Sequence, residues 1–143
     1  MSEILDFVNT AKNDGYDPLI EFFLGNVPNF QAMSIIAECD VDLRGCRKII
    51  NAYGVNHAIK RHGNDREEAK YQQVGLVDSD FQEIPLILSN PDKFERGKDT
   101  NRGNPVLKFY KKIKNKNYTV VMTYFKGGRK GAKLEFDTMY IKK

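Results

Sequence analysis

The sequence predicts one domain of the α+β class, with N-terminal helices packed on a small C-terminal antiparallel β-sheet. Its 143 residues match the commonest size of a single domain. Apolar residues recur at helical spacing over the first two thirds of the chain and alternate with polar residues in the last third. Helices followed by a strand meander are typical of this class. We expect a helical part at residues 1–54 and a core at residues 55–143.

Seven helical segments are predicted in the first ninety residues. The turn at Asn13-Asp14-Gly15 ends the first segment, and Pro18 and Gly25 bound the second. Gly63 ends the fifth, since glycine is favoured just past a helix. The residue before proline disfavours helix, so Asn90-Pro91 ends the last. The segments lie at residues 4–11, 19–24, 28–38, 45–53, 55–62, 65–72 and 80–89.

Three strands are predicted in the C-terminal part, at residues 106–113, 118–126 and 133–141. Turns at 114–117 and 126–131 join them into an antiparallel meander. In the last strand, strict alternation predicts that Leu134, Phe136, Thr138 and Tyr140 share one face.

The charge of the chain is unevenly distributed. Residues 1–92 hold 8 Lys or Arg against 15 Asp or Glu, whereas residues 93–143 hold 15 against 4. The corresponding net charges are −7 and +11, and several aromatic residues interleave with the basic ones. A basic, aromatic-rich segment favours a nucleic-acid partner, because cations hold phosphates and rings stack on bases. The alternative is a solvated basic face with its aromatic rings in the core.

Several classes of protein are excluded by missing motifs. Two cysteines are too few for a disulfide scaffold or a four-cysteine zinc site. The chain has neither a long apolar run nor a signal peptide, so we expect a cytoplasmic protein without membrane contact. It also has no phosphate-binding P-loop and no nucleophile elbow. We therefore expect no cofactor and no metal.

Both histidines of the chain lie in one short predicted helix. His57 and His62 are five residues apart, which places them about 140° apart around a helix, so they do not form a shared metal site. His62 lies at the end of the helix, where the dipole favours its cationic form beside Lys60 and Arg61. A surface or capping role is the alternative for either histidine. Histidine titrates near neutral pH, as acid–base catalysis requires.

These residues suit the metal-free transesterification of RNA. One group deprotonates the ribose 2′-OH, which attacks the adjacent phosphate, and another protonates the 5′-oxygen that leaves. Cations and hydroxyls, here including Thr123, Thr138 and Tyr140, would stabilise the charged phosphorane. The product would be a 2′,3′-cyclic phosphate, and DNA would resist cleavage because it lacks the 2′-OH.

Three motifs from residue 55 to the end carry a family resemblance. They are Asn56-His57-Ala58-Ile59-Lys60-Arg61-His62-Gly63, then Ile84-Pro85-Leu86-Ile87-Leu88-Ser89-Asn90-Pro91-Asp92, and the final strand from Lys133 to Tyr140. This stretch resembles the phage-associated branch of the barnase–EndoU–colicin–RelE-like nuclease superfamily. The resemblance implies a metal-independent ribonuclease site on the sheet of a nuclease-like core. It also implies a bacterial host and a gene carried by a phage, a prophage or another mobile element.

The resemblance assigns candidate residues by position. The catalytic candidates are His57, His62, Thr138 and Tyr140, and the lysine of the strand pair is Lys108, Lys111 or Lys112. Arg129, in a glycine-rich hairpin tip, is a candidate contact to a backbone phosphate. The complete set of candidate RNA- or phosphate-binding residues is Lys60, Arg61, Lys108, Lys111, Lys112, Thr123, Arg129 and Lys133.

The sequence leaves three functions open. The first is an endoribonuclease, toxin-like in character, with RNA as substrate and a protein inhibitor as a partner. The second is a nucleic-acid-binding module of the same fold that has lost catalysis. The third is a structural protein of a phage or mobile element, whose basic face binds an acidic protein partner.

Overall fold

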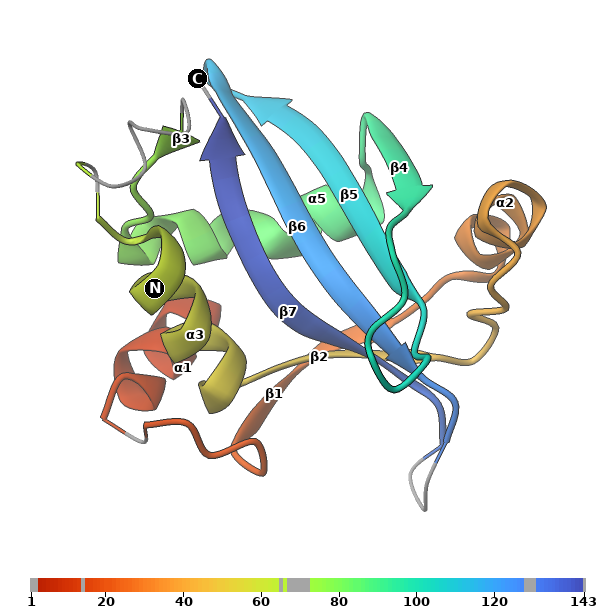
Figure 1. Cartoon of the computed structure of the whole chain (residues 1–143), viewed down its shortest axis with the longest axis horizontal. Helices are drawn as coiled ribbons and strands as arrows, with labels where there is room; N and C mark the ends of the chain where they lie inside the picture. Colours follow the sequence, from red (N-terminus) through yellow and green to blue (C-terminus); the bar gives the residue numbers. More distant parts are fainter. Residues whose placement is uncertain (1–2, 14, 65, 67–72, 128–130, 143) are drawn as a thin grey trace.

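The computed structural model describes residues 3–13, 15–64, 66, 73–127 and 131–142 (Figure 1). Within these residues a seven-stranded sheet has the order β1-β2-β7-β6-β5-β4, and β3 pairs with the far end of β7. The strands are β1 (Glu21–Asn26), β2 (Arg47–Asn51), β3 (Gln73–Val74), β4 (Lys93–Arg96), β5 (Val106–Ile113), β6 (Lys116–Phe125) and β7 (Lys133–Lys142).

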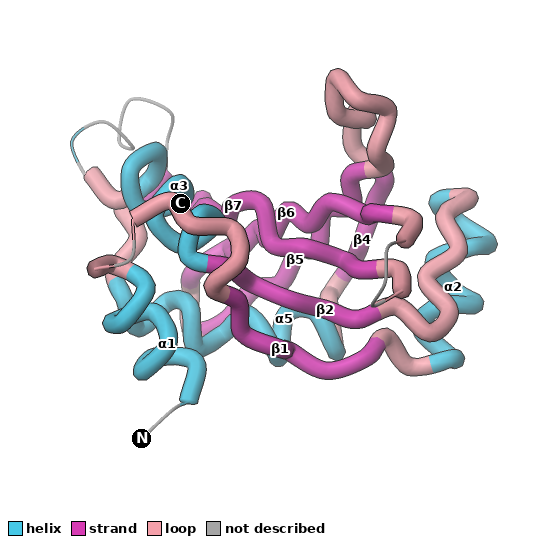
Figure 2. The backbone as a smooth tube through the Cα atoms, turned by 90° about the horizontal axis from the view of Figure 1, so that it is seen from below, coloured by secondary structure: helices cyan, strands magenta, loops and turns pink. Residues whose placement is uncertain are grey.

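The helices are α1 (Glu3–Ala11), α2 (Asn29–Cys39), α3 (Ala52–His62), the 3-10 helix η1 (Asp78–Glu83) and α5 (Ile84–Ser89). α1, η1 and α5 cover one face of the sheet, which we call the inner face (Figure 2). α1, η1 and α5 bury their apolar residues with Leu107, Phe109 and Met122 of the sheet in one core. α5 crosses behind β5 and β6 (Figure 1). None of the helices in the described part of the chain has the length and apolar character needed to cross a bilayer.

The α+β class is confirmed, and the C-terminal meander is present as predicted. β5, β6 and β7 pair in antiparallel register, and a two-residue turn at Lys114 and Asn115, both with positive φ, joins β5 to β6. The helices predicted at 4–11, 28–38, 55–62 and 80–89 correspond to α1, α2, α3 and the continuous η1–α5 segment. The helix predicted at residues 65–72 lies, except for residue 66, outside the described residues.

Two of the predicted helices are wrong, because residues 19–24 and 45–53 contribute strands instead. β1 pairs antiparallel with β2, and β2 pairs in parallel with β7 through Arg47, Lys48 and Ile49. Ile49 and Ile50 belong to an apolar pattern that fits a helix as well as a strand. In the structure they are buried on opposite faces of β2, which is covered on both sides, and such a strand lacks the polar alternation by which strands are recognised. The sheet is therefore mixed rather than purely antiparallel, and the N-terminal part is not only helical.

The predicted face of the last strand is wrong beyond its midpoint. The pairing of β6 with β7 shifts by one residue between Val121 and Met122, so that Asp137 is the extra residue of a β-bulge. Such a bulge reverses the side-chain alternation that follows it. Phe136 and then Met139 point into the core, whereas Thr138 points to the opposite side.

Candidate functional site

The face of the sheet opposite α1 and α5, which we call the outer face, carries most of the polar side chains of the strands. α3 borders it on one side, and the loop at residues 97–105 rises from β4 on the other (Figure 2). Strand pairing and alternation place three polar rows across β4 to β7. The rows are Lys112–Asn117–Lys142, Lys93–Tyr110–Thr119–Tyr140 and Glu95–Lys108–Val121–Thr138.

α3 lies against the edge of β7 that β2 and β3 leave unpaired. Asn51 caps the helix, its Oδ1 accepting a hydrogen bond from the Gly54 amide at 2.8 Å. Gly54 has no side chain because a Cβ there would come within 2.9 Å of the Phe136 carbonyl oxygen of β7. This close approach fixes the height of α3 above the outer face.

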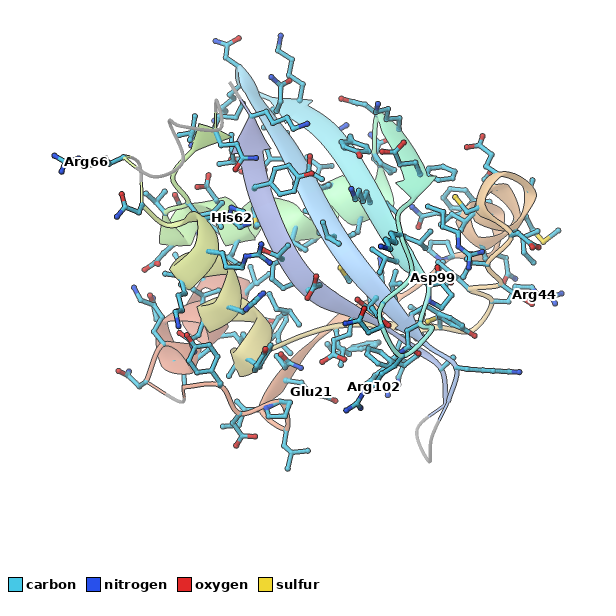
Figure 3. All side chains as sticks on the ribbon, viewed as in Figure 1. Glu21, Arg44, His62, Arg66, Asp99 and Arg102 are labelled. Carbon is cyan, nitrogen blue, oxygen red and sulfur yellow. The ribbon has the colours of Figure 1, made fainter. Side chains whose placement is uncertain are left out.

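The end of α3 brings His62 to the terminal strand. The imidazole of His62, which is labelled in Figure 3, lies beside the ring of Tyr140, with 5.6 Å between their centroids. Both side chains are half-buried. The structure thus brings together two of the four catalytic candidates, and Lys60, Arg61 and His62 fill the last turn of the helix.

His57 lies in a different environment from His62. Its ring stacks on Tyr53, one turn earlier in α3, with a centroid distance of 5.6 Å and an interplanar angle of 15°. Tyr53 in turn contacts Tyr16 edge to face. The two histidines therefore contact different aromatic partners, and His57 lies beside the pocket that Tyr53 lines.

Thr138 is the third catalytic candidate on the outer face. It follows the bulge residue Asp137 and is only 7% exposed. Its hydroxyl is the one buried side-chain oxygen or nitrogen in the described part of the chain that has no hydrogen-bond partner. Buried polar atoms are normally satisfied, so this unpaired hydroxyl, directly after the bulge, makes Thr138 a candidate for binding a ligand.

A pocket of about 200 Å³, which we call the acidic pocket, opens beside the bulge. Its carboxylates are Glu135 and Asp137, of which Glu135 accepts a hydrogen bond from Asn51 and forms an ion pair with Lys133 at 3.3 Å. Asp137 is exposed and makes no ion pair with a described residue. The remaining lining residues are Asn51, Tyr53, Thr123, Phe125 and Phe136.

The predicted phosphate-binding residues occupy different parts of the molecule. Lys108 and Lys112 lie on the outer face, whereas Lys111 points to the inner side and donates to the Asn90 carbonyl oxygen at 2.8 Å. Lys111 also forms an ion pair with Asp92 at 3.3 Å. Its position separates it from the strand lysines that line the outer face.

The other candidates divide between the outer face and its borders. Thr123 lies in the acidic pocket, and Lys133 is held by Glu135 with its ammonium 5.1 Å from the ring centroid of Phe125. Lys60 and Arg61 are exposed on α3. Arg129 lies outside the described residues. Among the described residues no three His, Cys, Asp or Glu side chains are grouped closely enough to hold a metal ion.

Sequence reasoning missed the carboxylates of the acidic pocket and their support from β2. The helix predicted at residues 45–53 placed Asn51 inside a helix, and no role in the site was predicted for Glu135 or Asp137. One signal was available: the apolar residues of the last strand are spaced by two, three and two residues, at Leu134, Phe136, Met139 and Ile141. A three-residue step in a strand indicates a bulge.

Comparison with known proteins places the chain in a family. No curated protein and no solved structure matches it. The family described as phage-Barnase-EndoU-ColicinE5/D-RelE like nuclease 3 matches residues 25–143. The resemblance noted from residue 55 is thus confirmed and extends thirty residues further toward the N-terminus. This extension includes β2, whose pairing with β7 places Asn51 and α3 beside the outer face. The chain belongs to this phage-associated family of barnase–EndoU–colicin–RelE-like nucleases.

Proposed function

We propose that this protein is a metal-independent endoribonuclease that cleaves RNA on the outer face of its sheet. Membership of a nuclease family indicates nuclease activity. The observation that carries the finer proposal is the combination of His62, Tyr140 and the unpaired Thr138 hydroxyl on a face that also presents lysines. These are the groups that transesterification requires.

The reaction needs two proton transfers and stabilisation of one developing charge. The 2′-oxygen forms a bond to phosphorus as its proton passes to a base, and the bond from phosphorus to the 5′-oxygen breaks as an acid protonates that oxygen. The products are a 2′,3′-cyclic phosphate and a free 5′-hydroxyl. Lys108 and the Thr138 hydroxyl would donate to the phosphorane oxygens.

We assign one proton transfer to His62, because it is the histidine in contact with the Tyr140 row. Two groups are candidates for the other transfer. Asp137 adjoins Thr138 in β7, and His57 stacks on Tyr53 at the border of the acidic pocket. Acid–base catalysis contributes about 10²- to 10⁴-fold, so variants of these residues separate the candidates.

The test is RNA cleavage by the purified full chain in EDTA, with the 3′ ends of the products analysed chemically. We expect cyclic-phosphate ends, no cleavage of matched DNA, and roughly a 10²- to 10⁴-fold lower rate for His62→Ala. His57→Ala and Asp137→Asn are compared in parallel. Lys126→Ala is the control, since this exposed residue lies outside the site. Cleavage that requires added Mg²⁺, or a fully active folded His62→Ala, would overturn the proposal.

Two other functions correspond to distinct outcomes of the same assay. RNA binding that weakens with salt, but without cleavage of any RNA, would favour a non-catalytic nucleic-acid-binding module. Neither binding nor cleavage would favour a structural role in a phage or mobile element. A toxin-like role predicts that expression of the wild type, but not of His62→Ala, arrests growth of a bacterial host.

A further inference from the structure

We propose that the outer face has a second phosphate subsite, formed by Lys93, Lys112 and Lys142, that binds the phosphodiester next to the one being cleaved. This inference rests on the proposed function, because it places the reacting phosphate at the Tyr140 row. It concerns a pocket distinct from the acidic pocket beside the bulge. Its ligand is an anionic phosphodiester of a single-stranded nucleic acid.

The geometry of the pocket supports this assignment. It has a volume of about 320 Å³ and lies where the ends of β5, β6 and β7 meet. Its lining comes from the first two polar rows of the outer face, with Asp92, Lys111 and Tyr118 completing it. The outer-face residues that line it are Lys93, Tyr110, Lys112, Asn117, Thr119 and Lys142.

The three lysines are available to an anion. Lys93, Lys112 and Lys142 form no side-chain hydrogen bond or ion pair with another described residue. Two of them instead lie over aromatic rings, Lys93 at 4.6 Å from the centroid of Tyr110 and Lys142 at 5.9 Å from that of Tyr140. These rings limit where the ammonium groups lie without neutralising them.

The carboxylates near the pocket are already engaged. Asp92 accepts from the Lys112 amide at 2.8 Å and pairs with Lys111 at 3.3 Å, and these bonds lower the pKa of its carboxyl. Glu95 accepts a hydrogen bond from the Tyr110 hydroxyl but keeps its negative charge, which acts on Lys93 and Lys142. Against this one carboxylate stand the three ammonium groups, so the charge of the described residues at this end of the sheet is net positive.

The rows of the sheet give the subsite its direction relative to the reacting phosphate. Neighbouring rows are two residues apart along each strand, which is roughly 7 Å. Lys142 and Lys112 thus lie one row beyond Tyr140, while Glu135 and Asp137 lie on the other side of Thr138. Carboxylates repel a phosphate, so the bound single-stranded RNA should extend from the reacting phosphate toward the lysines.

The test uses 2′-O-methyl oligonucleotides, which the proposed reaction does not cleave. Affinity is measured for a dinucleotide with one internal phosphate, for a trinucleotide with two, and for dinucleotides carrying an additional 5′- or 3′-terminal phosphate. For the wild type we expect the additional internal phosphate to tighten binding several-fold. Lys112→Ala and Lys142→Ala should each abolish most of this gain and lower the salt slope by roughly 0.7.

The control and the contrary results are specific. Lys126→Ala removes the same charge one residue beyond the opposite end of β6 and should keep the full gain. An equal loss in Lys126→Ala, or a full gain in both pocket variants, would overturn the subsite. A gain from terminal phosphates alone would also overturn it, since it would assign the pocket to a chain end. Absence of RNA cleavage with the expected binding pattern would refute the ribonuclease but leave the subsite intact.

Discussion

Substitution of Gly54 by alanine tests how α3 is held against β7. Alanine is the better helix former and by itself would stabilise the helix by up to about 1 kcal/mol. The added Cβ, however, would lie 2.9 Å from the Phe136 carbonyl oxygen and 3.0 Å from a carbon of its ring. Overpacking of this kind costs about 1–3 kcal/mol. We expect the contact to dominate, for a net destabilisation of roughly 1–2 kcal/mol.

Urea unfolding followed by circular dichroism measures this balance. With a slope of about 2 kcal/mol per molar urea, the middle of the usual range for small proteins, the midpoint should fall by roughly 0.5–1 M. Lys60→Ala, an exposed change in the same helix, is the control and should leave the midpoint nearly unchanged. Because α3 carries His62, Gly54→Ala should also slow RNA cleavage. A Gly54→Ala protein at least as stable as the wild type would refute the packing argument.

Three further substitutions or modifications test other parts of the structure. Tyr118→Phe removes a 2.7 Å hydrogen bond to Asp80, which is only 2% exposed, and should lower the free energy of unfolding by about 1.5–3 kcal/mol; an unchanged urea midpoint would contradict this. Lys48 is 6% exposed and forms no ion pair with a described residue, and burial lowers its pKa. Lys48→Met removes this buried charge and should raise the thermal unfolding midpoint; a lower midpoint would show that the ammonium is well solvated. Burial also raises the pKa of the Cys46 thiol from 9.0 to about 11, so at pH 8 it should react with a thiol reagent at least about 100-fold more slowly in the native protein than in urea.

The raised pKa of Cys46 also predicts how stability depends on pH. Above about pH 9 the unfolded chain loses the thiol proton while the folded chain keeps it. The unfolded state then binds fewer protons, so the contribution of Cys46 to stability falls as the pH rises from 9 to 11. Urea midpoints of the wild type and Cys46→Ala across this range should converge with rising pH, and parallel curves would contradict the assignment.

The sequence alone determined the features that depend on neighbours along the chain. The alternation in β5 and the start of β7, the amphipathic α1 and the helix ending at Gly63 were all predicted from local spacing. The concentration of positive charge in the last third of the chain was likewise readable without a structure. Motifs in α3, α5 and β7 were sufficient to identify the family.

Only the tertiary structure decided which residues meet on the outer face. β2 became a strand because it pairs with β7, more than eighty residues away, and local propensity carries no information about that partner. The bulge at Asp137 reversed the orientation of Thr138 and Tyr140, which placed them with Lys108 rather than in the core. Backbone hydrogen bonding between distant strands fixes register, and register decides the face of every side chain that follows. The candidate residues are therefore a property of the sequence, whereas their assembly into one site is a property of the sheet.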